Sequence, residues 1–119
     1  MSNFFTPHGV AIIGSSSFSG AHCVEYFLQH TNCNIVGISR SPGRIAASRR
    51  YSFFRLDVNK DLKKIIRILD AKQPDVIINF AAQGNSQYSW SNPSDWFTTN
   101  TLGICNLAFA LNVKPYLKR

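Results

Sequence analysis

Short apolar runs alternate with amphipathic stretches in the first part of this chain. Residues 10–13 form a continuous apolar run that ends at Gly14, as expected for a buried parallel strand that enters a tight turn. From Ser19 or Gly20 the apolar spacing becomes helical, and Asn32 interrupts it. The apolar residues that share one face of this stretch are Val24, Phe27 and Leu28. The pattern predicts a strand followed at once by a helix.

The middle of the chain predicts two further strands and a second helix. Residues 35–39 form an apolar run, and Pro42 with Gly43 then forces a loop. Residues 52–56 predict a short third strand. In the helix that follows, which is closed by Pro74, apolar residues recur at i, i+3, i+4 and i+7. These residues are Leu62, Ile65, Ile66 and Leu69.

A fourth strand and a last helix complete the pattern. Residues 75–80 are rich in β-branched and apolar side chains, which predicts a strand, and residues 93–111 predict a helix. One side of that helix carries Leu102, Cys105 and Phe109. The order β-α-β-β-α-β-α predicts an α/β fold, because each return between parallel strands needs a crossover helix. We expect one Rossmann-type domain over residues 1–119, with helices on both faces of a parallel sheet of strand order 3-2-1-4.

Composition narrows the class of protein. The chain has 119 residues, of which 45% are hydrophobic and 16% charged, as in ordinary soluble domains. No stretch approaches the roughly 18 to 20 apolar residues of a membrane span, and the amino terminus lacks the pattern of a secretory signal. We therefore expect a cytoplasmic protein that does not bind membranes. The spacing of the three cysteines and three histidines predicts mostly buried, reduced thiols and no metal site.

The charge of the chain indicates an anionic partner. Its 13 basic and 6 acidic side chains give a net charge of +7, which attracts nucleic acid, an anionic membrane or a phosphorylated small molecule. The clustered basic residues are Arg40, Arg44, Arg49, Arg50, Lys118 and Arg119. Aromatic side chains are not interleaved with them, as a stacking platform for nucleic acid requires. The pattern favours a phosphorylated small molecule and no nucleic acid.

A serine-rich segment, residues 14–20 (GSSSFSG), joins the first strand to the first helix. A pyrophosphate at this place meets backbone N–H groups and the positive end of the helix. Gly14 permits a tight turn, and Gly20 permits close packing of the helix against the strand. The hydroxyl groups of Ser15, Ser16 and Ser19 are further donors. The segment predicts a dinucleotide site, with a mononucleotide phosphate or a plain small-residue turn as alternatives.

Two later positions bear on which dinucleotide binds. An NAD site places a carboxylate at the end of strand two to bind the ribose 2'-hydroxyl, but this chain has Arg40 there. Because a guanidinium fork matches a phosphate, Arg40 favours NADP over NAD, with Arg44 assisting, and a solvated basic loop is the alternative. After the third strand, Asp57 and Val58 suit the adenine amino group and ring. Asp57 would equally serve to cap the helix that begins near Lys60.

Three ordered motifs follow the serine-rich segment. They are residues 79–86 (NFAAQGNS), 92–95 (NPSD) and 99–103 (TNTLG). Together with Gly14, Ser17 and Gly20, they resemble the extended short-chain dehydrogenase/reductase family, particularly its nucleotide-sugar epimerases and 4,6-dehydratases. The resemblance covers nearly the whole chain. The family fingerprint is G-x-x-G-x-x-G, so Ser17 replaces its middle glycine.

The resemblance implies an NAD(P)-dependent enzyme that transiently transfers hydride on a nucleotide-sugar, as an epimerase or as a lyase of the dehydratase class. With the residues singled out above, the expected cofactor-binding set is Gly14, Ser16, Ser17, Phe18, Ser19, Gly20, Arg40, Asp57, Val58, Phe80, Ala81, Ala82 and Thr99. For Ala81 and Ala82 alone, packing of a helix on the sheet is the alternative. Ser86, Gln87 and Tyr88 match positions that reach toward the sugar, and Asn100 matches a structural asparagine.

The resemblance also implies a catalytic pair that these residues lack. The family's chemistry needs a Ser or Thr and a Tyr-x-x-x-Lys pair, in which lysine lowers the tyrosine pKa so that the phenolate accepts a proton as hydride leaves. Lysine does not occur four residues after Tyr26, Tyr51 or Tyr88. We expect an inactive amino-terminal fragment, truncated after the fourth strand and its helix, with the catalytic strand beginning just past Arg119.

Truncation at that point would have consequences for association. It would leave the edge of the fourth strand unpaired and apolar faces of the flanking helices exposed. We therefore expect self-association, most simply as a homo-oligomer, with a missing partner segment as the alternative. A non-catalytic module that senses a dinucleotide is the alternative, since such a module would lack the catalytic pair without truncation.

Overall fold

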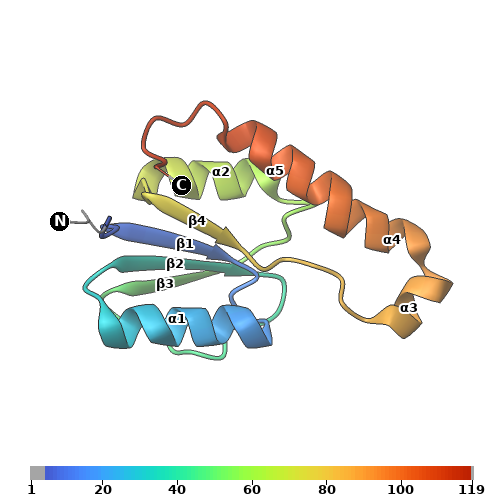
Figure 1. Ribbon diagram of the computed structural model, residues 1–119, viewed down its shortest axis with the longest axis horizontal. Helices are drawn as coiled ribbons and strands as arrows, with labels where there is room; N and C mark the ends of the chain where they lie inside the picture. The colour runs from blue at the N-terminus through green and yellow to red at the C-terminus, as the bar shows by residue number, and fades with distance from the viewer. Residues whose placement is uncertain (1–4, 119) are drawn as a thin grey trace.

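Four parallel strands form the central sheet of the described part of the chain, residues 5–118 of the computed structural model (Figure 1). The strands are β1 (Gly9–Ile13), β2 (Asn34–Ser39), β3 (Tyr51–Arg55) and β4 (Val76–Asn79). Their order is β3-β2-β1-β4, and β1 pairs in parallel with both β2 and β4. The predicted α/β fold and strand order are confirmed.

Helices cover both faces of the sheet (Figure 1). One face carries α1 (Phe18–His30), and the other carries α2 (Leu62–Lys72) and α5 (Ile104–Leu111). β1 contributes to both cores: Ala11 and Ile13 pack in the cluster that α2 covers, whereas Val10 and Ile12 pack in the cluster that α1 covers. Burial on both faces is the reason that residues 10–13 are continuously apolar.

The predicted apolar faces of the first two helices are confirmed. Val24 of α1 is buried, and Phe27 and Leu28 are partly buried beside it. Ile65 and Leu69 of α2 are buried against the opposite cluster.

The region predicted as one helix over residues 93–111 is divided. It consists of α4 (Pro93–Phe97), a π-helical segment η1 (Thr98–Gly103) and α5, and an unpredicted short helix α3 (Ser86–Ser91) precedes it. Leu102 and Phe109 of the predicted apolar side are 55% and 84% exposed, and Cys105 is exposed as well. The inner side instead carries Thr99, Gly103 and Leu107. Each hydrogen bond of a π-helix spans five residues rather than four, which turns the following residues relative to a continuous α-helix.

The cysteines are free thiols in different surroundings. Cys33 is buried and Cys23 is half-buried, but Cys105 is exposed, so the expectation of mostly buried thiols is wrong for Cys105. The described residues contain no group of three or more His, Cys, Asp or Glu side chains that would hold a metal ion. None of their helices is long and apolar enough to cross a membrane.

Arg50 closes the carboxyl end of α1. Its guanidinium group donates to the carbonyl oxygens of Leu28 and Thr31, each at 2.7 Å. These bonds satisfy carbonyl groups that the end of a helix leaves without partners, and they bring a cation to its negative end. One member of the predicted basic cluster is therefore engaged in the fold.

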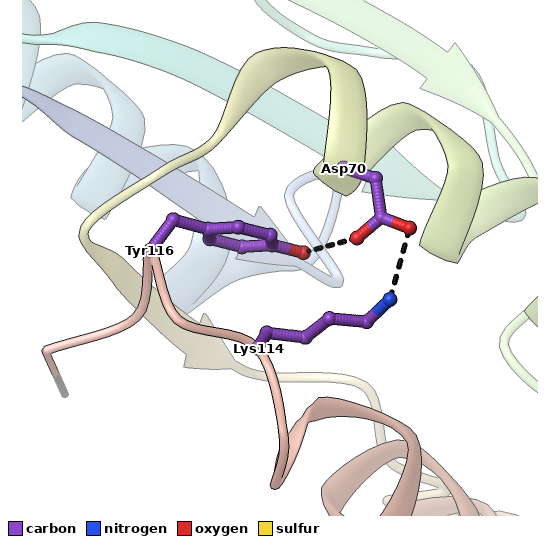
Figure 2. A network of polar contacts seen from close by, with 3 residues as sticks. All are labelled: Asp70, Lys114 and Tyr116. Carbon is purple, nitrogen blue, oxygen red and sulfur yellow. Dashed lines mark hydrogen bonds and ion pairs between the residues drawn. The ribbon is translucent and has the colours of Figure 1, made fainter.

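The chain after α5 turns back toward the sheet, and Asp70 of α2 binds two of its side chains (Figure 2). Lys114 Nζ lies 2.9 Å from Asp70 Oδ2, and the Tyr116 hydroxyl donates to Asp70 Oδ1 at 2.8 Å. The Lys118 amide donates to the carbonyl oxygen of Asp75, the residue before β4, at 2.8 Å. This segment is therefore fixed at the amino end of β4, opposite to the turn at Gly14.

Candidate functional site

The turn between β1 and α1 begins with a glycine in the left-handed region. Gly14 has a φ of 78°, a backbone conformation that residues with a Cβ atom rarely adopt. Its amide donates to the Ile38 carbonyl oxygen at the end of β2 at 2.7 Å. A Cβ atom at Gly14 would lie 2.6 Å from the Ala81 amide nitrogen. The turn therefore requires glycine both for its conformation and for the close approach of the chain that leaves β4.

Ser17 caps α1 and joins the two ends of the turn. Its hydroxyl group donates to the Gly14 carbonyl oxygen at 2.8 Å and accepts from the Gly20 amide at 3.0 Å. Ser17 has a φ of −67°, so this turn does not need a glycine at the middle position of the fingerprint. The first turn of a helix has no intrahelical acceptors for its amides, which leaves those of Phe18 and Ser19 available to an anion.

The other serine hydroxyl groups of the turn point in different directions. Ser16 is buried and donates to the Ser41 carbonyl oxygen at 3.0 Å. Ser15 is buried against Gly37 and Tyr51 of the sheet. Burial raises the pKa of the Tyr51 phenol, and the neighbouring Ser15 hydroxyl group lowers it. Ser15 therefore faces the sheet interior, and the expectation that its hydroxyl group offers a donor to phosphate is wrong.

A cleft of about 160 Å³ opens at the carboxyl ends of the strands. The predicted cofactor-binding residues that line it are Gly14, Ser16, Ser17, Arg40, Asp57, Val58, Phe80, Ala81, Ala82 and Thr99. Phe18, Ser19 and Gly20 lie in the adjoining helix start, outside this lining. The cleft is also lined by residues that sequence reasoning missed, which are Ile13, Ser39, Ser41, Leu56 and Asn59. The fold thus brings together the exits of all four strands.

Asp57 and Arg40 lie where the chain leaves β3 and β2. The Asp57 carboxylate accepts from the Asn59 amide at 2.8 Å, and α2 has Asp61, not Asp57, at its N-cap position. Asp57 therefore caps the turn that leads into α2, and not α2 itself. A hydrogen bond from the Asp57 amide lowers the pKa of Asp61. Arg40 is exposed, and its carbonyl oxygen accepts from Arg55 Nε at 2.9 Å.

Two neighbouring residues of η1 hold two different strand exits. Thr99 Oγ1 accepts from Asn59 Nδ2 at 3.0 Å, which ties η1 to the turn after β3. Asn100 Oδ1 accepts from the Gln83 amide at 2.8 Å, and Asn100 Nδ2 donates to the Gln83 carbonyl oxygen at 3.0 Å. Asn100 thus has the structural role that the resemblance implies. The side-chain partner of Asn59 lies 40 residues further along the chain, so no local pattern indicates this contact.

The predicted substrate contacts lie on α3. Ser86, Gln87 and Tyr88 are exposed and are not among the residues that line the cleft. The Tyr88 hydroxyl donates to Asp95 Oδ2 of α4 at 2.8 Å, and this hydrogen bond raises the pKa of Tyr88. Their contact with a sugar stays a prediction.

Tyr116 is unsuited to the proton transfer that the family's tyrosine performs. Burial and the hydrogen bond to Asp70 raise its pKa, whereas a catalytic tyrosine needs a lowered pKa. It also lies at the amino end of β4, away from the cleft, through the contacts shown in Figure 2. Tyr116 is therefore not placed to react with a ligand in the cleft.

Known proteins of related sequence share this part of their chains. Over 102 residues the chain is 28% identical to the dTDP-glucose 4,6-dehydratase of Salmonella typhimurium, an alignment that covers 79% of this chain and 28% of that protein. Over 109 residues it is 28% identical to the UDP-glucose 4-epimerase of Mycoplasma genitalium, covering 87% of this chain and 32% of that protein. The chain spans less than a third of the length of these curated relatives.

A solved structure shares the fold. The UDP-glucose 4-epimerase of Thermus thermophilus in complex with NAD matches with a TM-score of 0.75 and 26% identity, over 87% of this chain and 33% of that chain. The Rossmann-type arrangement of sheet and helices is thus common to both proteins. From residue 10 to residue 116 the sequence matches the model of the NAD dependent epimerase/dehydratase family, and the chain belongs to that family.

Proposed function

We propose that this chain is the dinucleotide-binding portion of a nucleotide-sugar epimerase or dehydratase, and that its cleft holds NAD or NADP. The turn from Gly14 to Gly20 carries the proposal. A left-handed glycine, a capping serine and a helix start lie together at one end of a parallel sheet. This is the place where open α/β sheets bind ligands.

The pyrophosphate is proposed to lie at the amino end of α1. The amides of Phe18 and Ser19 point out of the first helical turn, where the helix dipole favours negative charge. Ser17 already satisfies the Gly20 amide, so the ligand meets the remaining amides of the turn. Gly14 has no side chain that would keep a phosphate away from the backbone.

The adenosine is proposed to lie between the exits of β2 and β3. Asp57 and Val58 line this side of the cleft and suit the adenine. Arg40 lines the same side, is exposed, and forms no ion pair among residues 5–118. Its guanidinium group favours the 2'-phosphate of NADP, although relatives in the family have NAD bound.

The nicotinamide is proposed to lie at the exit of β4. Phe80, Ala81, Ala82 and Thr99 line this end of the cleft. A bound nicotinamide supplies hydride transfer, and the residues of this chain hold and orient it. Ser86, Gln87 and Tyr88 are proposed to reach the sugar. We propose that the Tyr-Lys pair lies in a further part of the parent protein, so that this portion binds cofactor without turnover.

Fluorescence titration with NADH and NADPH tests the proposal. We expect saturable binding of at least one of them, with amide NMR shifts concentrated in residues 14–20. Gly14→Ala should abolish binding because its Cβ atom would meet Phe80 and Ala81 backbone atoms within 3 Å. Gly43→Ala is the matched control, since a Cβ atom there makes only ordinary contact with Phe53 at 3.4 Å. A folded protein that binds neither dinucleotide would contradict the proposal.

A further inference from the structure

A second hollow of about 190 Å³ adjoins the cleft and shares part of its wall. The residues common to both are Arg40, Asp57, Asn59 and Thr99. Lys60, which follows β3, also lines the second hollow. The segments after β4 contribute Gln83, Asp95 and Thr98. An acidic side chain of α4 therefore shares a small space with Arg40.

Tyr88 holds this acidic side chain in place. The Tyr88 hydroxyl donates to Asp95 Oδ2 at 2.8 Å. The Asp95 carboxylate raises the pKa of Tyr88 and the charge of Arg40 lowers it, so the pair lies within electrostatic range of Arg40. The other carboxylate of the hollow, Asp57, is already engaged by the Asn59 amide. Asp95 therefore differs from Asp57 in its position: it lies in the wall of the hollow formed by residues after β4, and its hydrogen-bond partner Tyr88 also follows β4 in the chain.

We infer that Asp95 is a specificity-determining residue that weakens binding of a 2'-phosphate beside Arg40. The inference rests on the proposed function, because it requires a dinucleotide in the cleft. An NAD site has a carboxylate at the end of its second strand, and this chain has Arg40 there. Asp95 brings a negative charge into the neighbouring hollow from a different element.

The two charges act in opposite directions on the two cofactors. Asp95 attracts the Arg40 guanidinium and repels a phosphate, but it does not oppose the uncharged 2'-hydroxyl group of NAD. Lys60 and Asp57 line the same hollow, so the preference of the chain between NADP and NAD is set by all of these charges, with Asp95 opposing the cations, and not by Arg40 alone.

Dissociation constants of NADP and NAD, measured by calorimetry on the same variants, test this balance. Asp95→Asn should tighten NADP by a factor on the order of three to ten and change NAD much less. Glu25→Gln is the matched control, because it removes one negative charge from the exposed surface of α1. In an Arg40→Ala background, the effect of Asp95→Asn on NADP should shrink.

The outcomes separate the inference from the proposed function. If the wild-type chain binds neither dinucleotide, the proposed function fails and the inference fails with it. If both bind, and Asp95→Asn changes the ratio of their constants no more than Glu25→Gln does, the inference alone is wrong. Asp95 is exposed, and Asp95→Ser provides a second uncharged variant that must give the same shift.

Discussion

A Cβ atom at Gly20 would lie 2.1 Å from the carbonyl oxygen of Gly14, far inside van der Waals contact. The opposing atom belongs to the backbone of a turn that is itself fixed by Ile38, so it has little freedom to move. We expect Gly20→Ala to lower the free energy of unfolding by about 1 to 3 kcal/mol and to abolish dinucleotide binding. Urea denaturation measures the change. Gly84→Ala, at a glycine with no atom within 4 Å of its Cβ position, should leave stability nearly unchanged.

Ser17 takes the place of a fingerprint glycine but contributes a helix cap. Ser17→Ala removes both hydrogen bonds of its hydroxyl group and should cost about 1 kcal/mol of stability. Ser17→Gly should lower the free energy of unfolding by only roughly a few tenths of a kcal/mol, because glycine is well tolerated at the cap position. Thermal unfolding followed by circular dichroism measures both. Equal losses in the two variants would contradict the capping role.

Gly37 leaves room for two hydroxyl groups beneath the turn. A Cβ atom there would lie 2.4 Å from the Tyr51 hydroxyl oxygen and 2.8 Å from Ser15 Oγ. Gly37→Ala should therefore destabilise the fold by about 1 to 3 kcal/mol. Tyr51→Phe removes the nearer oxygen, so the double variant should lose less than the sum of the single losses. Additive losses in a double-mutant cycle would show that the clash lies elsewhere.

Acid should loosen the segment that Asp70 holds. Hydrogen bonds from Lys114 and Tyr116 lower the pKa of Asp70 in the folded protein. This carboxylate therefore stabilises the fold above its unfolded pKa of about 3.9, and the contribution is lost as pH falls through the lowered native pKa. We expect the melting temperature of the wild type to fall more steeply below about pH 4 than that of Asp70→Asn.

The difference in melting temperature between the wild type and Asp70→Asn isolates the contribution of Asp70. Asp61 and Asp75 also have lowered pKa values, so both melting curves should decline in acid. Only the difference between them reports on Asp70. Parallel curves from neutral pH down to acid unfolding would mean that the Asp70 contacts do not hold the segment in solution.

The apolar side of η1 and α5 should promote self-association. Leu102 and Phe109 are both exposed, and Val113, just beyond α5, is 79% exposed. We expect sedimentation equilibrium to show association that increases with protein concentration. Leu102→Gln with Phe109→Gln should weaken it without loss of stability, since neither side chain packs in the core. A monomeric wild-type protein at all concentrations would contradict this expectation.

The sheet and its glycine turn could be predicted from the sequence because local patterns decide them. Residues 10–13 lie in a strand buried on both faces, which gives an uninterrupted apolar run. Gly14 and Gly20 lie where a side chain would clash with neighbouring backbone atoms. Because only glycine fits such positions, the sequence itself marks the turn. The alternation of strands with helices indicates a parallel sheet but does not by itself decide the order, since β2 and β3 are parallel neighbours joined without a helix.

The remaining features depend on contacts between distant parts of the chain. The last helical region has two apolar stripes, and periodicity does not indicate whether Leu107 or Phe109 faces the sheet. The π-helical segment that shifts the register has no simple sequence sign. Arg50 and Asp70 have partners far along the chain, so their roles as helix closure and segment anchor were not predictable. The run of serines does not indicate that Ser15, unlike its neighbours, is buried against Gly37 and Tyr51 of the sheet.

The paired contacts of Thr99 and Asn100 have a mechanical consequence. One turn of η1 braces the exit of β3 through Asn59 and the exit of β4 through Gln83. Whatever pushes these two loops apart must therefore strain or rotate that turn. The distance between the two loops therefore depends on the wider, π-helical winding of η1. Deleting one residue of η1 to restore α-helical winding would change the distance between the two walls of the cleft.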